Sequence, residues 1–149
     1  MTPTLLGRLE TRVASVLLVG VAWTAVVTLL LPPSGLAPTA ARLGDLYRLT
    51  FGALGLLVVL GLAIWEPVYQ LLQQFRWEKD WPAMFVLVQV VPEGALVYFV
   101  LGKLATGAPL GWPGFALDFG TTWLVIFAFV HGPIRVPFLR WRFRGGRVL

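Results

Sequence analysis

The sequence contains no cysteine and only one histidine, His131. The missing cysteines exclude disulfides, zinc–thiolate sites, iron–sulfur clusters and cysteine nucleophiles. A single histidine excludes any haem or metal site that takes two histidines from one chain. The sequence also has no glycine-rich phosphate loop, Gly-x-Ser-x-Gly elbow or His-Glu-x-x-His motif, so soluble-type hydrolysis and nucleotide chemistry are not expected.

Charge is scarce as well. Charged residues make up 13% of the 149 residues, and hydrophobic residues make up 58%. A soluble domain carries about 25% charged residues. A chain this short with half that proportion has too little polar surface to stay in water, so we expect a membrane protein.

Four apolar runs are long enough to cross a bilayer, because about 20 helical residues at about 1.5 Å each span a core about 30 Å thick. Lone apolar strands would leave backbone groups unpaired in lipid. The first run has arginines before it and small residues after it, as a signal peptide does, but its length favours an uncleaved anchor. The sequence predicts an all-α, integral membrane four-helix bundle, a single domain over residues 1–149 with spans at about 13–31, 49–66, 83–101 and 121–139.

The positive residues are distributed unevenly around these runs. Cytoplasmic segments carry the excess of Lys and Arg, so both termini are expected in the cytoplasm. Ten arginines against two lysines, with abundant Ala, Gly, Leu and Pro, are typical of a GC-rich bacterial genome, and we expect the bacterial cytoplasmic (inner) membrane. Nine positive residues lie on the predicted inner side (Arg8, Arg12, Arg76, Lys79, Arg135, Arg140, Arg142, Arg144 and Arg147), and three lie on the outer side (Arg42, Arg48 and Lys103).

The segments between the runs differ in character. Residues 102–120 hold several glycines and prolines, which favour turns over helix, so an irregular segment is expected there. Pro92 permits a local kink in the third run. After the second run, the apolar residues fall on one helical stripe, so that helix either continues past a kink at Pro67 or gives way to a short amphipathic helix on the inner surface. The stripe consists of Val68, Leu71, Leu72 and Phe75.

Glu93 is the most distinctive candidate site residue. It lies ten residues into the third run, roughly 15 Å from its inner end, where an ionised carboxylate must face protein or water. His131 lies at the same expected depth in the fourth run. Gln89 and Arg135 each lie one turn closer to the cytoplasm, so we expect Glu93 to meet His131 and Gln89 to meet Arg135. Arg135 has the alternative of extending to lipid headgroups.

Three roles for this intramembrane polar site remain open at the level of sequence. The first is an interhelical clasp that fixes packing and contributes about 1–2 kcal/mol. The second is a contact between Glu93 and a basic residue of a partner subunit. The third is a proton or ion path, since a neighbouring Glu and His exchange protons readily.

Three further groups of residues are candidates for contacts. Gly20, Thr24 and Thr28 form a small-xxx-small ridge that lets helices approach closely, inside the bundle or with another chain. A mixed charged patch after the second run is either a solvated turn or a docking surface for a cytoplasmic protein; it consists of Glu66, Glu78, Lys79 and Asp80. The arginine-rich tail begins at the membrane and consists of Arg140, Arg142, Arg144 and Arg147. Each cation near anionic lipid contributes about 1 kcal/mol to membrane binding. We therefore expect the tail to bind lipid headgroups or a partner protein, and we do not expect it to bind nucleic acid.

These observations lead to one functional hypothesis and two alternatives. The hypothesis is a small non-catalytic membrane subunit, or assembly and scaffold partner, of a larger bacterial membrane complex. The first alternative is an oligomeric proton-linked transporter or channel that uses Glu93 and His131. The second is an enzyme acting on lipid through Glu93, His131 and Arg135, a thin set of groups for catalysis. No cofactor or metal is predicted, and apolar grooves leave no local signature for bound lipid, quinone or pigment.

Overall fold

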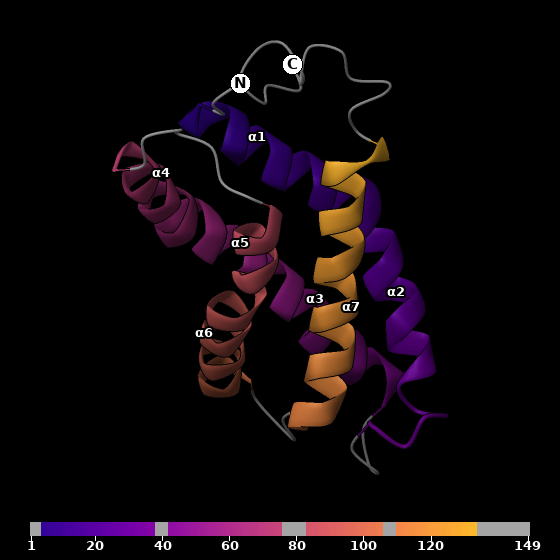
Figure 1. The fold of residues 1–149 in the computed structure, drawn as a ribbon. Helices are drawn as coiled ribbons and strands as arrows, with labels where there is room; N and C mark the ends of the chain where they lie inside the picture. Colours follow the sequence, from indigo (N-terminus) through magenta and orange to yellow (C-terminus); the bar gives the residue numbers. More distant parts are fainter. Residues whose placement is uncertain (1–3, 38–41, 76–82, 106–109, 134–149) are drawn as a thin grey trace.

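A computed structural model of the chain describes residues 4–37, 42–75, 83–105 and 110–133 (Figure 1). Within these ranges, every regular element is a helix. Four helical stretches are long and apolar enough to cross a membrane: Leu5–Leu30, Leu43–Gln74, Val86–Leu104 and Trp112–His131. The predicted all-α, four-span architecture is confirmed.

The first stretch begins earlier than the predicted residue 13. It consists of α1 (Leu5–Ser15), the π-helical segment η1 (Val16–Gly20) and α2 (Val21–Leu30). The Thr4 hydroxyl starts it by accepting a hydrogen bond of 3.1 Å from the Gly7 backbone N–H. In Figure 1, α1 crosses one end of the molecule at a steep angle to α2, and η1 lies at the bend.

The second stretch consists of α3 (Leu43–Leu60), the π-helical segment η2 (Gly61–Trp65) and α4 (Glu66–Gln74), which form 32 continuous helical residues. Of the two alternatives for Pro67, continuation is therefore the one observed. The side chains of α4 are arranged with polar groups inward: Glu66, Tyr69 and Gln73 are buried, and the predicted apolar stripe faces out.

The third stretch contains a break beside the predicted kink. Helix α5 (Ala83–Val88) ends at Val88, and α6 (Val90–Leu104) begins after Gln89. A proline has no N–H, and its ring displaces the carbonyl four residues before it. Val88 is four residues before Pro92, so the break between α5 and α6 lies where this displacement is expected, five residues before Glu93 at most.

The fourth stretch, α7 (Trp112–His131), corrects two expectations. Residues 112–120 are helical where turns were expected, because Pro113 lies in the first turn of the helix, where proline is well tolerated. Helix α7 then ends at His131, followed by Gly132 with φ −123° and ψ −96° and by Pro133, which disfavours helix in the residue before it. His131 is therefore at a helix end and not at its middle.

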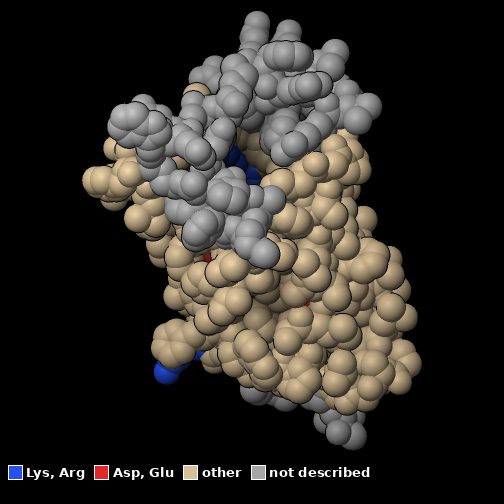
Figure 2. Space-filling model, in the orientation of Figure 1, with Lys and Arg blue, Asp and Glu red and all other residues tan. Residues whose placement is uncertain are grey.

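The core lies among α2, α3, α6 and α7, and α3 contacts the other three. Its buried apolar side chains include Ala53, Leu54, Val97 and Phe115. The outward surface is also apolar, and on the face drawn in Figure 2 the charged atoms of the described residues appear only as small spots. An apolar exterior of this kind fits a multi-pass membrane protein.

The ridge of Gly20, Thr24 and Thr28 lies inside this bundle. A Cβ added at Gly20 would lie 3.1 Å from Cδ1 of Ile126 on α7. Thr24 and Thr28 are 1% and 0% exposed, so the ridge packs against α3 and α7 of its own chain. Of the two alternatives left open by the sequence, packing within the bundle is the one that the structure contains.

Candidate functional site

Among the described residues, the largest set of buried charges centres on Arg12. Its Nη1 and Nη2 donate to Oε2 and Oε1 of Glu93 at 2.9 and 3.0 Å, and its Nε donates to Oε1 of Glu66 at 2.7 Å. Nη1 also lies 3.3 Å from the Leu57 carbonyl oxygen. One guanidinium thus joins the first, second and third helical stretches.

Two further residues extend this set. Arg8 Nη2 donates to Gln73 Oε1 at 2.7 Å, and Arg8 Nη1 lies 3.7 Å from Glu66 Oε2. We call the five residues the Arg12 cluster: Arg8, Arg12, Glu66, Gln73 and Glu93. Two guanidinium groups face two carboxylates, so the formal charges of the cluster cancel.

Three local features of the sequence bring the cluster together. Arg8 and Arg12 are four residues apart and therefore lie on one face of α1. Glu66 and Gln73 lie on the buried face of α4. Gly61, the first residue of η2, provides the space, because a Cβ there would lie 2.5 Å from Arg12 Cδ and 2.6 Å from its Nε and Nη1.

The cluster is well paired for its depth of burial. The Glu93 side chain is 0% exposed, and those of Arg12 and Glu66 are 13% and 10% exposed. Taking a charge out of water costs several kcal/mol, which is recovered only when partners satisfy the ion with good geometry. Both Glu93 oxygens are bound by the two Arg12 amino groups, an arrangement typical of strong, directional charge pairs. This geometry favours the clasp among the three roles open at the level of sequence.

The predicted pairing of Glu93 with His131 is not among the hydrogen bonds and ion pairs of the described residues. His131 Nδ1 lies 2.9 Å from the Phe127 carbonyl oxygen, one turn back on its own helix, and its ring packs on the Phe127 ring. Gln89 lies at the break between α5 and α6. Arg135, its predicted partner, lies outside the described residues. The sequence indicated Glu93 as the buried acid but assigned its partner to the fourth helical stretch, whereas the observed partner, Arg12, lies on the first.

The predicted docking patch loses one of its members. Glu66 is buried in the Arg12 cluster and is 7% exposed, so it does not contribute to a solvated cytoplasmic surface. The remaining members of the patch, Glu78, Lys79 and Asp80, lie outside the described residues. So do the four tail arginines, Arg140, Arg142, Arg144 and Arg147.

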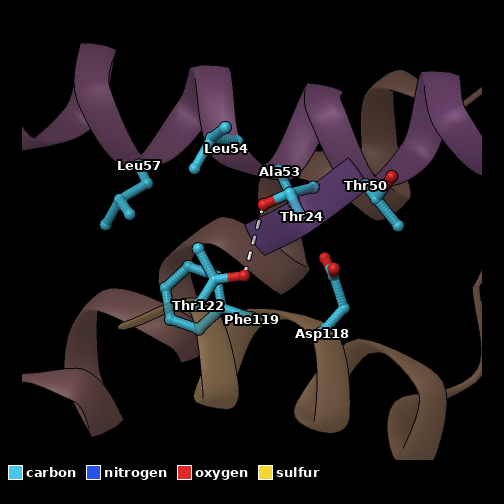
Figure 3. Close-up of a pocket in the computed structure, with 8 residues that line it drawn as sticks. All are labelled: Thr24, Thr50, Ala53, Leu54, Leu57, Asp118, Phe119 and Thr122. Atoms are coloured by element: carbon cyan, nitrogen blue, oxygen red, sulfur yellow. Dashed lines mark hydrogen bonds between the residues drawn. The ribbon is translucent and has the colours of Figure 1, made fainter. Parts of the chain in front are cut away.

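A second polar group lies in the other half of the bundle, at a pocket between α2, α3 and α7 (Figure 3). Asp118 is 2% exposed, and its Oδ1 has no hydrogen-bond partner among the described residues. Nearby, the Thr24 and Thr122 hydroxyls lie 3.2 Å apart, and the Thr28 and Thr50 hydroxyls lie 2.8 Å apart. The pocket is lined by Thr24, Thr50, Ala53, Leu54, Leu57, Asp118, Phe119 and Thr122, all of them buried.

Sequence reasoning missed Arg12 and Asp118 for identifiable reasons. Arg12 directly precedes the first apolar run and was assigned a topological role, although a buried Glu93 requires a positive partner. Asp118 was assigned to an irregular segment. Trp112 followed by Pro113 is a signal for a helix start, and extending the fourth helix back to it would have placed Asp118 one turn before Thr122.

The described residues contain no group of three or more His, Asp or Glu side chains that could hold a metal ion. The fold and the site define a four-span helical protein with a charge-neutral clasp near one end and an acid–hydroxyl pocket in its core. Comparison of the chain with protein-family models, curated proteins and solved structures found no match.

Proposed function

We propose that the protein is a small non-catalytic subunit, or assembly partner, of a larger membrane complex in the bacterial cytoplasmic membrane. The observation that carries this proposal is the internal pairing of the Arg12 cluster. The carboxylates and guanidinium groups of this cluster are bound to one another and join three helical stretches, so they are not available to a substrate. A site of this kind holds the helices of a scaffold protein together, and the outward apolar surface remains available to bind other subunits.

The exposed apolar side chains support this role. Phe75, at the end of α4, is 81% exposed, and Phe99 on α6 is 63% exposed. Such side chains pack equally well against lipid tails and against the helices of another subunit. The proton-linked alternative has less support, because Arg12 binds both oxygens of the carboxylate that would carry the proton.

Site-specific photocrosslinking in the native membrane tests the proposal. With p-benzoyl-phenylalanine in place of Phe75 or Phe99, we expect a crosslinked product of discrete, higher mass that contains a second protein. The matched control is the same replacement at Phe115, which is 1% exposed and should give no intermolecular product. Crosslinks to lipid alone at both exposed positions, together with the mass of a single chain on native electrophoresis, would contradict the proposal.

The orientation is part of the same proposal and rests on the uneven distribution of Lys and Arg. Fusions of a fluorescent protein to either terminus are expected to fluoresce, and fusions of alkaline phosphatase there are expected to be inactive, because both ends lie in the cytoplasm. A truncated chain fused after Ala105, following three spans, serves as the control and should give the reverse pattern. Active phosphatase at either terminus would contradict this topology.

A further inference from the structure

The pocket beside Asp118 is small and lined by buried residues. Its volume is about 10 Å³, which leaves room for about one water-sized particle. Three helices contribute to its wall, so its shape depends on the assembled bundle. Ala53, Leu54, Leu57 and Phe119 form the apolar part of the lining, and Asp118 with three threonines forms the polar part.

Asp118 is the unusual member of this lining. Its carboxylate points into the pocket, toward the side that carries Thr24 and Thr50 (Figure 3). No ion pair to Asp118 is present among the described residues, where Arg8 and Arg12 pair with Glu66 and Glu93. A buried carboxylate without a compensating charge is costly, so a positive charge in the pocket would have a large effect on stability.

The threonines supply neutral oxygen ligands next to this acid. Thr24 and Thr122 share one hydrogen bond of 3.2 Å, whichever of them donates. Each hydroxyl oxygen has two lone pairs and one hydrogen, so lone pairs on this pair remain available to a cation. The Thr50 hydroxyl lies 2.8 Å from that of Thr28 and donates to the Leu46 carbonyl oxygen at 3.0 Å, which fixes its place in the wall of the pocket.

We propose that this pocket binds one sodium ion, held by the Asp118 carboxylate and by the hydroxyl oxygens of Thr24 and Thr122. One carboxylate supplies one negative charge, which a monovalent cation balances, whereas calcium sites in proteins use 6–8 oxygen ligands and are richer in carboxylates. Hard oxygen ligands select hard cations. A charged ligand gives a strong field, which favours the smaller sodium ion over potassium. The site does not involve the Arg12 cluster and is independent of the proposed function.

Binding of radioactive ²²Na⁺ to the purified full chain in detergent tests the site, with choline chloride keeping the ionic strength constant. We expect saturable binding of one ion per chain that lithium displaces and choline does not. Sodium binding to the native state is also expected to raise the thermal midpoint as its concentration rises. Absence of saturable binding to the wild-type chain would overturn the proposal, and a proton on Asp118 would then account for the buried acid.

Two substitutions and one control assign the binding to these residues. Asp118→Asn keeps the shape and removes the charge, so sodium binding should be lost. Thr122→Val removes one ligand oxygen while keeping the branched shape, and affinity should fall at least about tenfold. Asp45→Asn makes the same charge change at a side chain that is 54% exposed and should leave affinity unchanged. Unchanged sodium affinity in a folded Asp118→Asn or Thr122→Val variant would contradict the assignment.

Discussion

Replacing Arg12 with alanine is expected to lower the free energy of unfolding by about 3–5 kcal/mol, the cost typical of removing one partner of a buried ion pair. The substitution leaves Glu93, which is 0% exposed, without the group that binds both its oxygens, and it removes the 2.7 Å bond to Glu66. Unfolding by SDS titration from mixed detergent micelles, followed by circular dichroism, gives the measurement. The reduced stability should also appear as aggregation during purification.

The matched control is Arg48→Ala. Arg48 is 86% exposed and lies 3.8 Å from Asp45 one turn away, and such surface pairs contribute at most about 0.5 kcal/mol. Combining Arg12→Gln with Glu93→Gln should recover part of the loss, because removing a complete charge pair costs less than leaving one member unpaired, and Arg8 with Glu66 remains balanced. If Arg12→Ala and Arg48→Ala have equal effects, the Arg12 cluster is not a clasp.

Gly61→Ala is expected to destabilise the protein almost as strongly as the loss of Arg12. The added methyl group would lie 2.5–2.6 Å from three atoms of the Arg12 side chain, so that side chain must shift, and because both Glu66 and Glu93 hold its guanidinium, the shift disturbs the charge pairs. Overpacking by itself costs about 1–3 kcal/mol, and the broken charge pairs add to that cost. The same SDS titration measures the effect.

Gly55→Ala in α3 provides the control for this substitution. Nothing lies within 4 Å of a Cβ at Gly55, and alanine is the better helix former, so stability should stay the same or rise by up to about 1 kcal/mol. In the double variant Gly61→Ala with Arg12→Ala, the two losses should not add, because both act on the same contacts. Fully additive losses would show that Gly61 acts through something other than Arg12.

The sequence allowed the four spans to be predicted because length and hydropathy are properties of single segments. The bounds of the helices were less predictable where the same residues can indicate either of two structures. Pro113 with Gly114 signals either a turn or the first turn of a helix, and the choice depends on what packs beside it. At Gly114 the neighbour is the Leu36 carbonyl oxygen, 2.7 Å from where a Cβ would lie, and this residue is far away in the chain.

The candidate site was predictable only in part, for a related reason. A buried acid such as Glu93 can be recognised from its own segment, because its cost in lipid depends on depth. Its partner depends on how three helices cross, and pairing it with His131 assumed that neighbours in sequence are neighbours in space. On α4, Glu66, Tyr69 and Gln73 recur at helical spacing and are buried, although amphipathic helices usually turn polar groups toward water, so their inward direction depends on the helices packed against them.

The Arg12 cluster also constrains the order in which the chain can assemble during synthesis. Glu66 follows Arg12 by 54 residues, and Glu93 follows it by 81 residues. At about 5–20 residues per second, the last carboxylate emerges from the ribosome roughly 4–16 s after the guanidinium. A helical hairpin of the first two spans therefore contains two guanidinium groups of the cluster and only one carboxylate. The first three spans form the smallest unit in which the charges of the cluster balance. The fourth span, with Asp118, is added to a unit that is already neutral.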